Sequence, residues 1–179
     1  MIHIAICPLL HGAIAAIDDD GRLVLCEDLP QIREPGGVAW IDVKKLATQI
    51  VIARDDRHAQ AQLQVRIAIN QCNVRNAPDS AFLKGVVLGS ILAALQQLNL
   101  PSDLIPAAKW KASMGFGPEP TWSMHKSAML DLAWHLFPEA KLDRNAAFQA
   151  EALLLAEYCR QAAIAAARPS NVVPIRAFA

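Results

Sequence analysis

Hydrophobic and polar positions divide the N-terminal part of the chain into three short apolar runs. The runs cover residues 2–7, 12–18 and 22–28 and are rich in Ile, Ala, Leu and Val. An Asp-Asp-Asp-Gly stretch joins the second run to the third, and an Asp-Gly pair between apolar runs is typical of a β-hairpin turn. We therefore predict three consecutive strands and interpret the three aspartates as turn residues rather than as a cation site.

The spacing of apolar residues changes after a Pro- and Gly-containing loop at residues 31–37. Residues 41–57 have apolar positions at helical spacing, and Asp42 can cap the start of this helix. Residues 63–71 alternate between two faces, with Leu, Val and Ile on one of them, which predicts a fourth strand.

A second helix is predicted over residues 81–98, with Asp79 or Ser80 as its cap. Gly85 and Gly89 lie on this apolar helix, and two small residues at this spacing permit close packing. We favour packing within the core, and a dimer interface is the alternative.

The remaining elements complete an α/β pattern. We predict a strand at 103–107, a helical turn at 107–114, and helices at 122–137 and 146–167. The order βββαβαβαα indicates a mixed five-stranded sheet flanked by helices on both faces. We expect one domain over residues 1–167 and an irregular C-terminal tail over residues 168–179.

Composition limits the possible functions. The 179 residues are 54% hydrophobic, and 17 basic residues balance 17 acidic ones, so any nucleic-acid binding must come from a local basic patch. The cysteines show no CxxC spacing, which favours reduced thiols and no structural metal. We see no signal peptide, and the longest apolar stretch is too short to span a bilayer. We expect a soluble cytoplasmic protein without a membrane partner.

Five segments in matching order carry a more specific signal. They are VIARDDRHAQAQLQVRIAINQ, GVVLGSILAAL, IPAAKWKASMGF with a later Lys126, LDLAWHLFPEAKL and AEALLLAEYCRQ. Together with the order of elements, they resemble the RuvC-type Holliday-junction resolvases of the RNase H-like superfamily, particularly their phage-borne branch. The resemblance covers nearly the whole chain and implies an RNase H-like fold.

The resemblance also implies a site for two divalent metal ions held by about four carboxylates. This chain has other residues at three of those positions. Cys7 stands at the end of the first strand, Asn70 stands at the end of the fourth, and Ala147 or Phe148 stands at the start of the last helix. Only Glu151 remains. We therefore expect no catalytic residues, no metal site and no cofactor, with Mg²⁺ needed only if the chain is an active nuclease. The resemblance also implies that the strands carrying Cys7 and Asn70 are adjacent and parallel, and that both side chains and Glu151 converge at one edge of the sheet.

Basic residues flank the loop at residues 115–121. Lys109 and Lys111 precede this loop and His125 and Lys126 follow it, and by resemblance Lys111 and Lys126 lie where resolvases carry basic residues beside the cleft. Such residues suit contacts with phosphate, and a solvated surface is the alternative. We add three further DNA-binding candidates: Arg75, Arg144 and Trp122.

The other aromatic and reactive residues have structural interpretations. We expect core positions for Trp40, Trp110 and Trp134, a hydrogen-bonded structural role for His11, and an inert buried thiol rather than a redox-sensitive one for Cys7.

Three functions remain open. The first is a catalytically inactive resolvase relative that binds branched or duplex DNA, including four-way junctions, as a homodimer. The second is a protein-interaction module that does not bind DNA. The third is an active metal-dependent nuclease that uses displaced acids such as Asp143, Glu151 or Glu157.

Overall fold

A mixed five-stranded sheet forms the centre of the computed structural model, which describes residues 1–33, 39–55, 63–69, 78–117 and 122–167. The strands lie in the order β3-β2-β1-β6-β7. The pairs β1–β2 and β2–β3 are antiparallel, whereas β1–β6 and β6–β7 are parallel. The bounds are β1 (Ile2–Ile6), β2 (Ala13–Asp18), β3 (Leu23–Asp28), β6 (Leu63–Ile69) and β7 (Ser102–Pro106). The predicted mixed sheet of five strands is confirmed.

The predicted hairpin turn joins β2 to β3. Arg22 N–H donates a hydrogen bond of 2.8 Å to Asp18 Oδ1, and Gly21 N–H donates one of 3.0 Å to the Asp18 carbonyl. Gly21 has φ 81°, in the left-handed region that glycine adopts without a Cβ penalty. These contacts explain the aspartate run as a turn.

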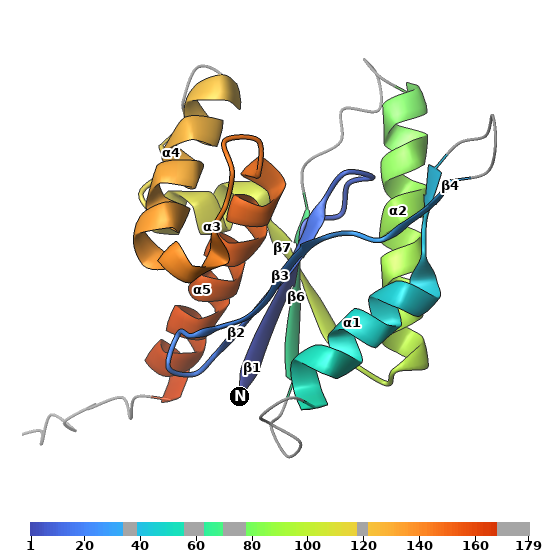
Figure 1. The fold of residues 1–179 in the computed structure, drawn as a ribbon, viewed down its shortest axis with the longest axis horizontal. Coiled ribbons are helices and arrows are strands. Elements are labelled where there is room, and N and C mark those ends of the chain that lie inside the picture. Colours follow the sequence, from blue (N-terminus) through green and yellow to red (C-terminus); the bar gives the residue numbers. More distant parts are fainter. Residues whose placement is uncertain (34–38, 56–62, 70–77, 118–121, 168–179) are drawn as a thin grey trace, which may run out of the picture.

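Helices cover both faces of the sheet, which gives three layers (Figure 1). On one face lie α1 (Val43–Asp55) and α2 (Pro78–Gln97). On the other lie α3 (Ala107–Ser113), α4 (Trp122–Leu136) and α5 (Ala147–Ala167), with a short 3₁₀ turn, η1 (Pro138–Ala140), between the last two. None of the described helices is long and apolar enough to cross a membrane.

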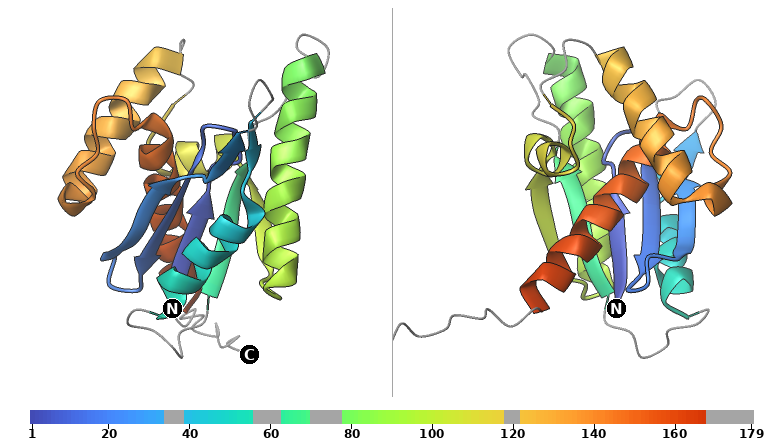
Figure 2. Two further views of the ribbon diagram at one scale, coloured as in Figure 1. Left: turned by 45° about the vertical axis from the view of Figure 1, so that its right-hand side comes forward. Right: turned by 90° about the vertical axis from the view of Figure 1, so that its left-hand side faces the viewer.

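Alternation along β1 divides the core between the two faces. Ile2, Ile4 and Ile6 pack with α1 and α2, whereas Ala5 packs with α3, α4 and α5. The sheet face under α5 also carries small residues from β2, so this helix lies directly on the strands and crosses them obliquely (Figure 2). By the same alternation, Cys7 belongs to the face that α5 covers.

Two local predictions near the first and second helices have different outcomes. The Asp42 cap is confirmed, because Lys45 N–H donates a hydrogen bond of 2.9 Å to Asp42 Oδ1. The cap at Asp79 or Ser80 is wrong, because α2 begins at Pro78. A proline suits the first position of a helix, where its missing N–H has no intrahelical acceptor.

The loop prediction at residues 31–37 is also wrong in part. Two short strands, β4 (Gln31–Arg33) and β5 (Ala39–Ile41), pair with each other as a separate antiparallel sheet. Three-residue strands are too short to show alternation in a sequence.

Several core predictions need correction. Trp110 is fully buried as predicted, but Trp40 and Trp134 are 41% and 37% exposed. Trp134 donates its indole N–H to the Leu142 carbonyl at 2.9 Å, so its polar edge is satisfied at the surface. The predicted core packing of Gly85 and Gly89 is wrong, because both are exposed and a Cβ at either position meets no atom of the described residues within 4 Å.

Candidate functional site

Two parallel strands end at the same edge of the sheet. Cys7 directly follows β1, and β6 runs parallel to β1 with Ile6 paired to Ile67. The predicted adjacency of these strands is confirmed. Asn70, which follows β6 in the sequence, lies outside the described residues.

The thiol of Cys7 meets the carboxylate of Glu151. Cys7 Sγ donates a hydrogen bond of 3.5 Å to Glu151 Oε2, across 144 positions of sequence. Glu151 lies one turn into α5 on its buried face and is 0% exposed. The predicted proximity of Cys7 and Glu151 is therefore confirmed.

A third residue completes this arrangement from α3. Lys111 Nζ lies 2.8 Å from Glu151 Oε1, and the Lys111 side chain is 13% exposed. The ammonium group also lies 5.4 Å from the centre of the Trp110 ring, within the range of a cation–π contact. We call Cys7, Lys111 and Glu151 the Glu151 cluster.

Electrostatics explains why these three residues stay together. An isolated carboxylate in the protein interior is costly to desolvate, and an opposite charge at ion-pair distance offsets that cost. Burial raises the pKa of the Cys7 thiol well above its ordinary value of 9.0, and the negative charge of Glu151 and their hydrogen bond raise it further, against a lowering effect of Lys111. The thiol therefore stays neutral and donates a hydrogen bond, which supports the inert interpretation over the redox-sensitive one.

The described residues do not fit a two-metal centre. Divalent ions such as Mg²⁺ require several oxygen ligands, and the carboxylate of Glu151 already faces an ammonium group and a thiol. One turn before Glu151 along α5, Ala147 is buried and Phe148 packs partly against the core, and neither has a side-chain oxygen. No group of three or more His, Cys, Asp and Glu residues able to hold a metal occurs in the described part of the chain.

The displaced acids have other partners. Asp143 is exposed and accepts a hydrogen bond of 2.6 Å from Asn145 N–H through its Oδ1. Glu157 forms an ion pair of 2.7 Å with Arg160, and it lies six residues beyond Glu151 on α5, a rise of about 9 Å along the axis. The structure does not gather these acids with Glu151 into one ligand set.

Of the predicted DNA-binding residues, Lys111 belongs to the Glu151 cluster, and the others that the structure describes lie in two further places. Lys126 and Arg144 line a common pocket of about 470 Å³ together with Trp134 and Asp131. Lys109 is exposed on α3. Arg75 lies outside the described residues, and so does the side chain of Trp122, although this residue begins α4.

His11 lies at the surface beside the first strand pair. It is exposed, and its Nδ1 lies 3.4 Å from Gln31 Nε2. This contact agrees with the predicted hydrogen-bonded role.

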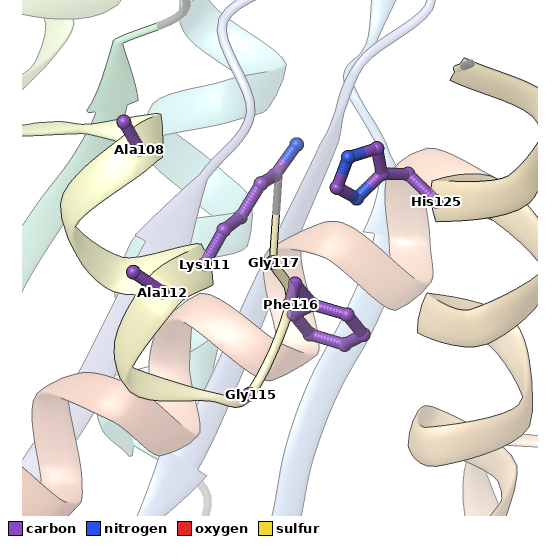
Figure 3. Close-up of a pocket in the computed structure, with 7 residues that line it drawn as sticks. All are labelled: Ala108, Lys111, Ala112, Gly115, Phe116, Gly117 and His125. Carbon is purple, nitrogen blue, oxygen red and sulfur yellow. The ribbon is translucent and has the colours of Figure 1, made fainter. Parts of the chain in front are cut away.

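Sequence reasoning missed one further residue beside the Glu151 cluster. Phe116 lines a pocket with Lys111 and His125 between α3 and α4 (Figure 3). The flanking glycines, Gly115 and Gly117, are the signal in the sequence, because an aromatic residue between two glycines in a loop has few neighbours along the chain to cover it.

Comparison with solved structures identifies the fold. The structure of Thermus thermophilus RuvC in complex with a Holliday junction substrate matches with a TM-score of 0.62 and 14% sequence identity, over 92% of this chain and 96% of that chain. A second Thermus thermophilus RuvC structure matches with a TM-score of 0.60 and 16% identity, over 92% and 97%. No family model and no curated protein sequence matches the chain. The RNase H-like α/β prediction is confirmed, and the chain has the fold of RuvC.

Proposed function

We propose that this RuvC-fold protein binds DNA, branched or duplex, without metal-dependent cleavage. The observation that carries the proposal is the Glu151 cluster. The one acid that remains of the expected ligand set is held by Lys111 at 2.8 Å and by the Cys7 thiol at 3.5 Å. An ammonium group in this place neutralises the carboxylate and has no capacity to activate water.

The replaced carboxylates also favour contact with a phosphate backbone. Several clustered carboxylates repel DNA unless cations are present, whereas Cys7 is held neutral and the charge of Glu151 is compensated. Lys109, Lys126 and Arg144 add positive charge on α3, on α4 and before α5. The similar RuvC structure holds a Holliday junction substrate, which supports DNA as the partner to test first.

The test compares a four-way junction with a linear duplex of matched sequence. Binding is measured by electrophoretic mobility shift without metal, and cleavage is then measured with Mg²⁺ and with Mn²⁺. Metal-free binding without cleavage supports the proposal. Cleavage with either ion contradicts it in favour of an active nuclease.

A protein-interaction module is the second candidate function, and exposed apolar residues favour it. Phe82 is 67% exposed on α2, and Ile32 and Trp40 are exposed on β4 and β5. Absence of DNA binding at low salt, where phosphate contacts are strongest, would favour this candidate.

We also propose that the protein is a homodimer that acts in the cytoplasm. Phe82, Gly85 and Gly89 lie at helical spacing along α2, and all three are exposed, which is suited to close approach of a second copy. The described cysteines are free thiols, which fits a reducing compartment.

A further inference from the structure

A pocket of about 470 Å³ lies beside the Glu151 cluster, between α3 and α4. Its volume is within the range of about 300–1,000 Å³ that is common for small-molecule sites. Lys111 contributes to both the cluster and the pocket wall. A ligand in this pocket would therefore lie against the lysine that pairs with the buried Glu151 carboxylate.

The lining combines three kinds of group. Lys111 supplies a positive charge, His125 supplies an imidazole, and Phe116 supplies an aromatic ring, all directed into the space between the two helices (Figure 3). Gly115 and Gly117 form part of the wall, and a Cβ at either position would meet no atom of the described residues within 4 Å.

The imidazole of His125 is notable because its Nδ1 is buried and has no hydrogen-bond partner among the described residues. A buried polar atom without a partner is destabilising, and a ligand that pairs with it recovers this cost. Lys111 lines the same pocket, and a positively charged ammonium group attracts phosphate.

We propose that this pocket binds a nucleotide, with the base against Phe116 and the phosphate at Lys111 and His125. Inorganic phosphate would contact Lys111 and His125 but would leave the Phe116 ring without a partner. An uncharged aromatic ligand would contact the ring but would offer no anion to Lys111 and His125. A base with its phosphate satisfies both, since bases stack on aromatic side chains and phosphate pairs with cations.

The nucleotide has two possible sources with the same chemistry. It is either a free mononucleotide or an unpaired nucleotide within a DNA strand. The inference does not depend on the DNA binding proposed above, because the first source requires no strand.

The first experiment titrates the protein with thymidine 5′-monophosphate, thymidine or inorganic phosphate and measures heat by calorimetry. We expect saturable binding of the monophosphate. Because base stacking contributes about 1–3 kcal/mol, Phe116→Leu and Phe116→Ala should each weaken binding by at least about fivefold. The leucine variant keeps apolar volume, so its folding, checked by thermal melting, stays close to that of wild type.

Matched controls are available on other surfaces. Ile52→Ala removes an exposed apolar side chain on α1, on the opposite face of the sheet, and His135→Ala removes an exposed histidine near the other end of α4. Both should bind the monophosphate like wild type, whereas His125→Ala should bind it more weakly.

The second experiment tests the strand as the source. A duplex with one extra unpaired thymidine is compared with a perfect duplex in wild type, Phe116→Leu and the control Ile52→Ala. We expect wild type and the control variant to prefer the duplex with the unpaired nucleotide, and Phe116→Leu to lose this preference. This result would support the proposal and identify a DNA strand as the source of the nucleotide. If the perfect duplex binds but neither experiment shows an effect of Phe116, the nucleotide pocket is excluded while DNA binding stands. If no DNA binds but the monophosphate does so through Phe116, the pocket stands and the proposed function fails.

Discussion

Lys111 Nζ lies 2.8 Å from Glu151 Oε1, and this contact joins α3 to the buried face of α5. Glu151 is the single acid that remains of the ligand set expected from the resemblance, and it has a cation from the protein itself beside it. The same lysine was predicted from the sequence to contact phosphate. In the structure, its nearest anion is a carboxylate.

Removal of Lys111 should destabilise the fold. Lys111→Ala leaves the buried Glu151 carboxylate without its counter-charge, and breaking such a pair by removing one partner costs about 3–5 kcal/mol. Lys109→Ala is the control on the same helix, and because Lys109 is exposed its effect should stay within about 0.5 kcal/mol. Urea unfolding at pH 7 measures both. Equal midpoints for the two variants would show that the ion pair does not stabilise the folded state.

Alkaline pH should lower the free energy of unfolding, and Cys7 should contribute to this change. Burial raises the folded-state pKa of this thiol well above 9.0, so the unfolded chain loses the proton first as pH rises. The contribution to stability is complete below about pH 9 and falls as pH rises above it. Cys7→Ala removes this contribution.

The measurement is the free energy of unfolding between pH 8 and pH 10.5, with the decline smaller in Cys7→Ala than in wild type. Burial also raises the pKa of Cys26, to about 12, so Cys26→Ala serves as a second variant with an effect in the same direction. A decline that is identical in wild type and Cys7→Ala would contradict the prediction.

Restoring the expected acids should restore metal binding only when they are combined. Cys7→Asp, Asn70→Glu and Phe148→Asp together should bind Mn²⁺ in calorimetry and cleave a junction, with Ala147→Asp as the alternative to Phe148→Asp. Cys7→Asp alone should lower the free energy of unfolding. The Cys7 thiol now donates a hydrogen bond of 3.5 Å to Glu151, so an aspartate at this position would place a second carboxylate beside the first, and the two negative charges would repel each other. A folded triple variant that binds no Mn²⁺ would remove support for an ancestral nuclease site.

Lys126 and Arg144 should contact DNA backbone. Replacing either residue with Ala should weaken binding to all sequences alike and lower the slope of log K against log salt by about one unit. Lys44→Ala is the control, because Lys44 is exposed on α1, on the opposite face of the sheet. Fluorescence anisotropy with a labelled duplex at several salt concentrations measures the slope. An unchanged slope in both the Lys126 and the Arg144 variant would place the DNA elsewhere.

The exposed face of α2 should mediate dimer formation. Phe82→Glu places a charge in the proposed interface and should shift the protein toward the monomer in sedimentation velocity experiments. Leu104→Glu, at an exposed position of β7, should leave the sedimentation coefficient unchanged. A monomeric wild type would contradict the homodimer directly.

The sequence by itself determined the elements whose signals are local. The short apolar runs rich in Ile and Ala predicted β1 and β2, the Asp-Gly pair predicted the turn from β2 to β3, and Asp42 marked the start of α1. These features depend on neighbours within a few residues, where spacing and turn chemistry are informative. The cap of α2 was missed because a proline three residues before Ala81 can begin the helix itself.

Only the tertiary structure decided that Lys111 joins Cys7 and Glu151. The three residues come from distant segments. The resemblance implied that Cys7 and Glu151 converge, but it gave Lys111 a contact with phosphate, and nothing local indicated that a buried carboxylate would face this lysine. Trp40 and Trp134 were expected in the core, yet both side chains lie on the exposed sides of β5 and α4. Burial is a property of the packed layers, and it depends on which side of each element the neighbouring layer covers.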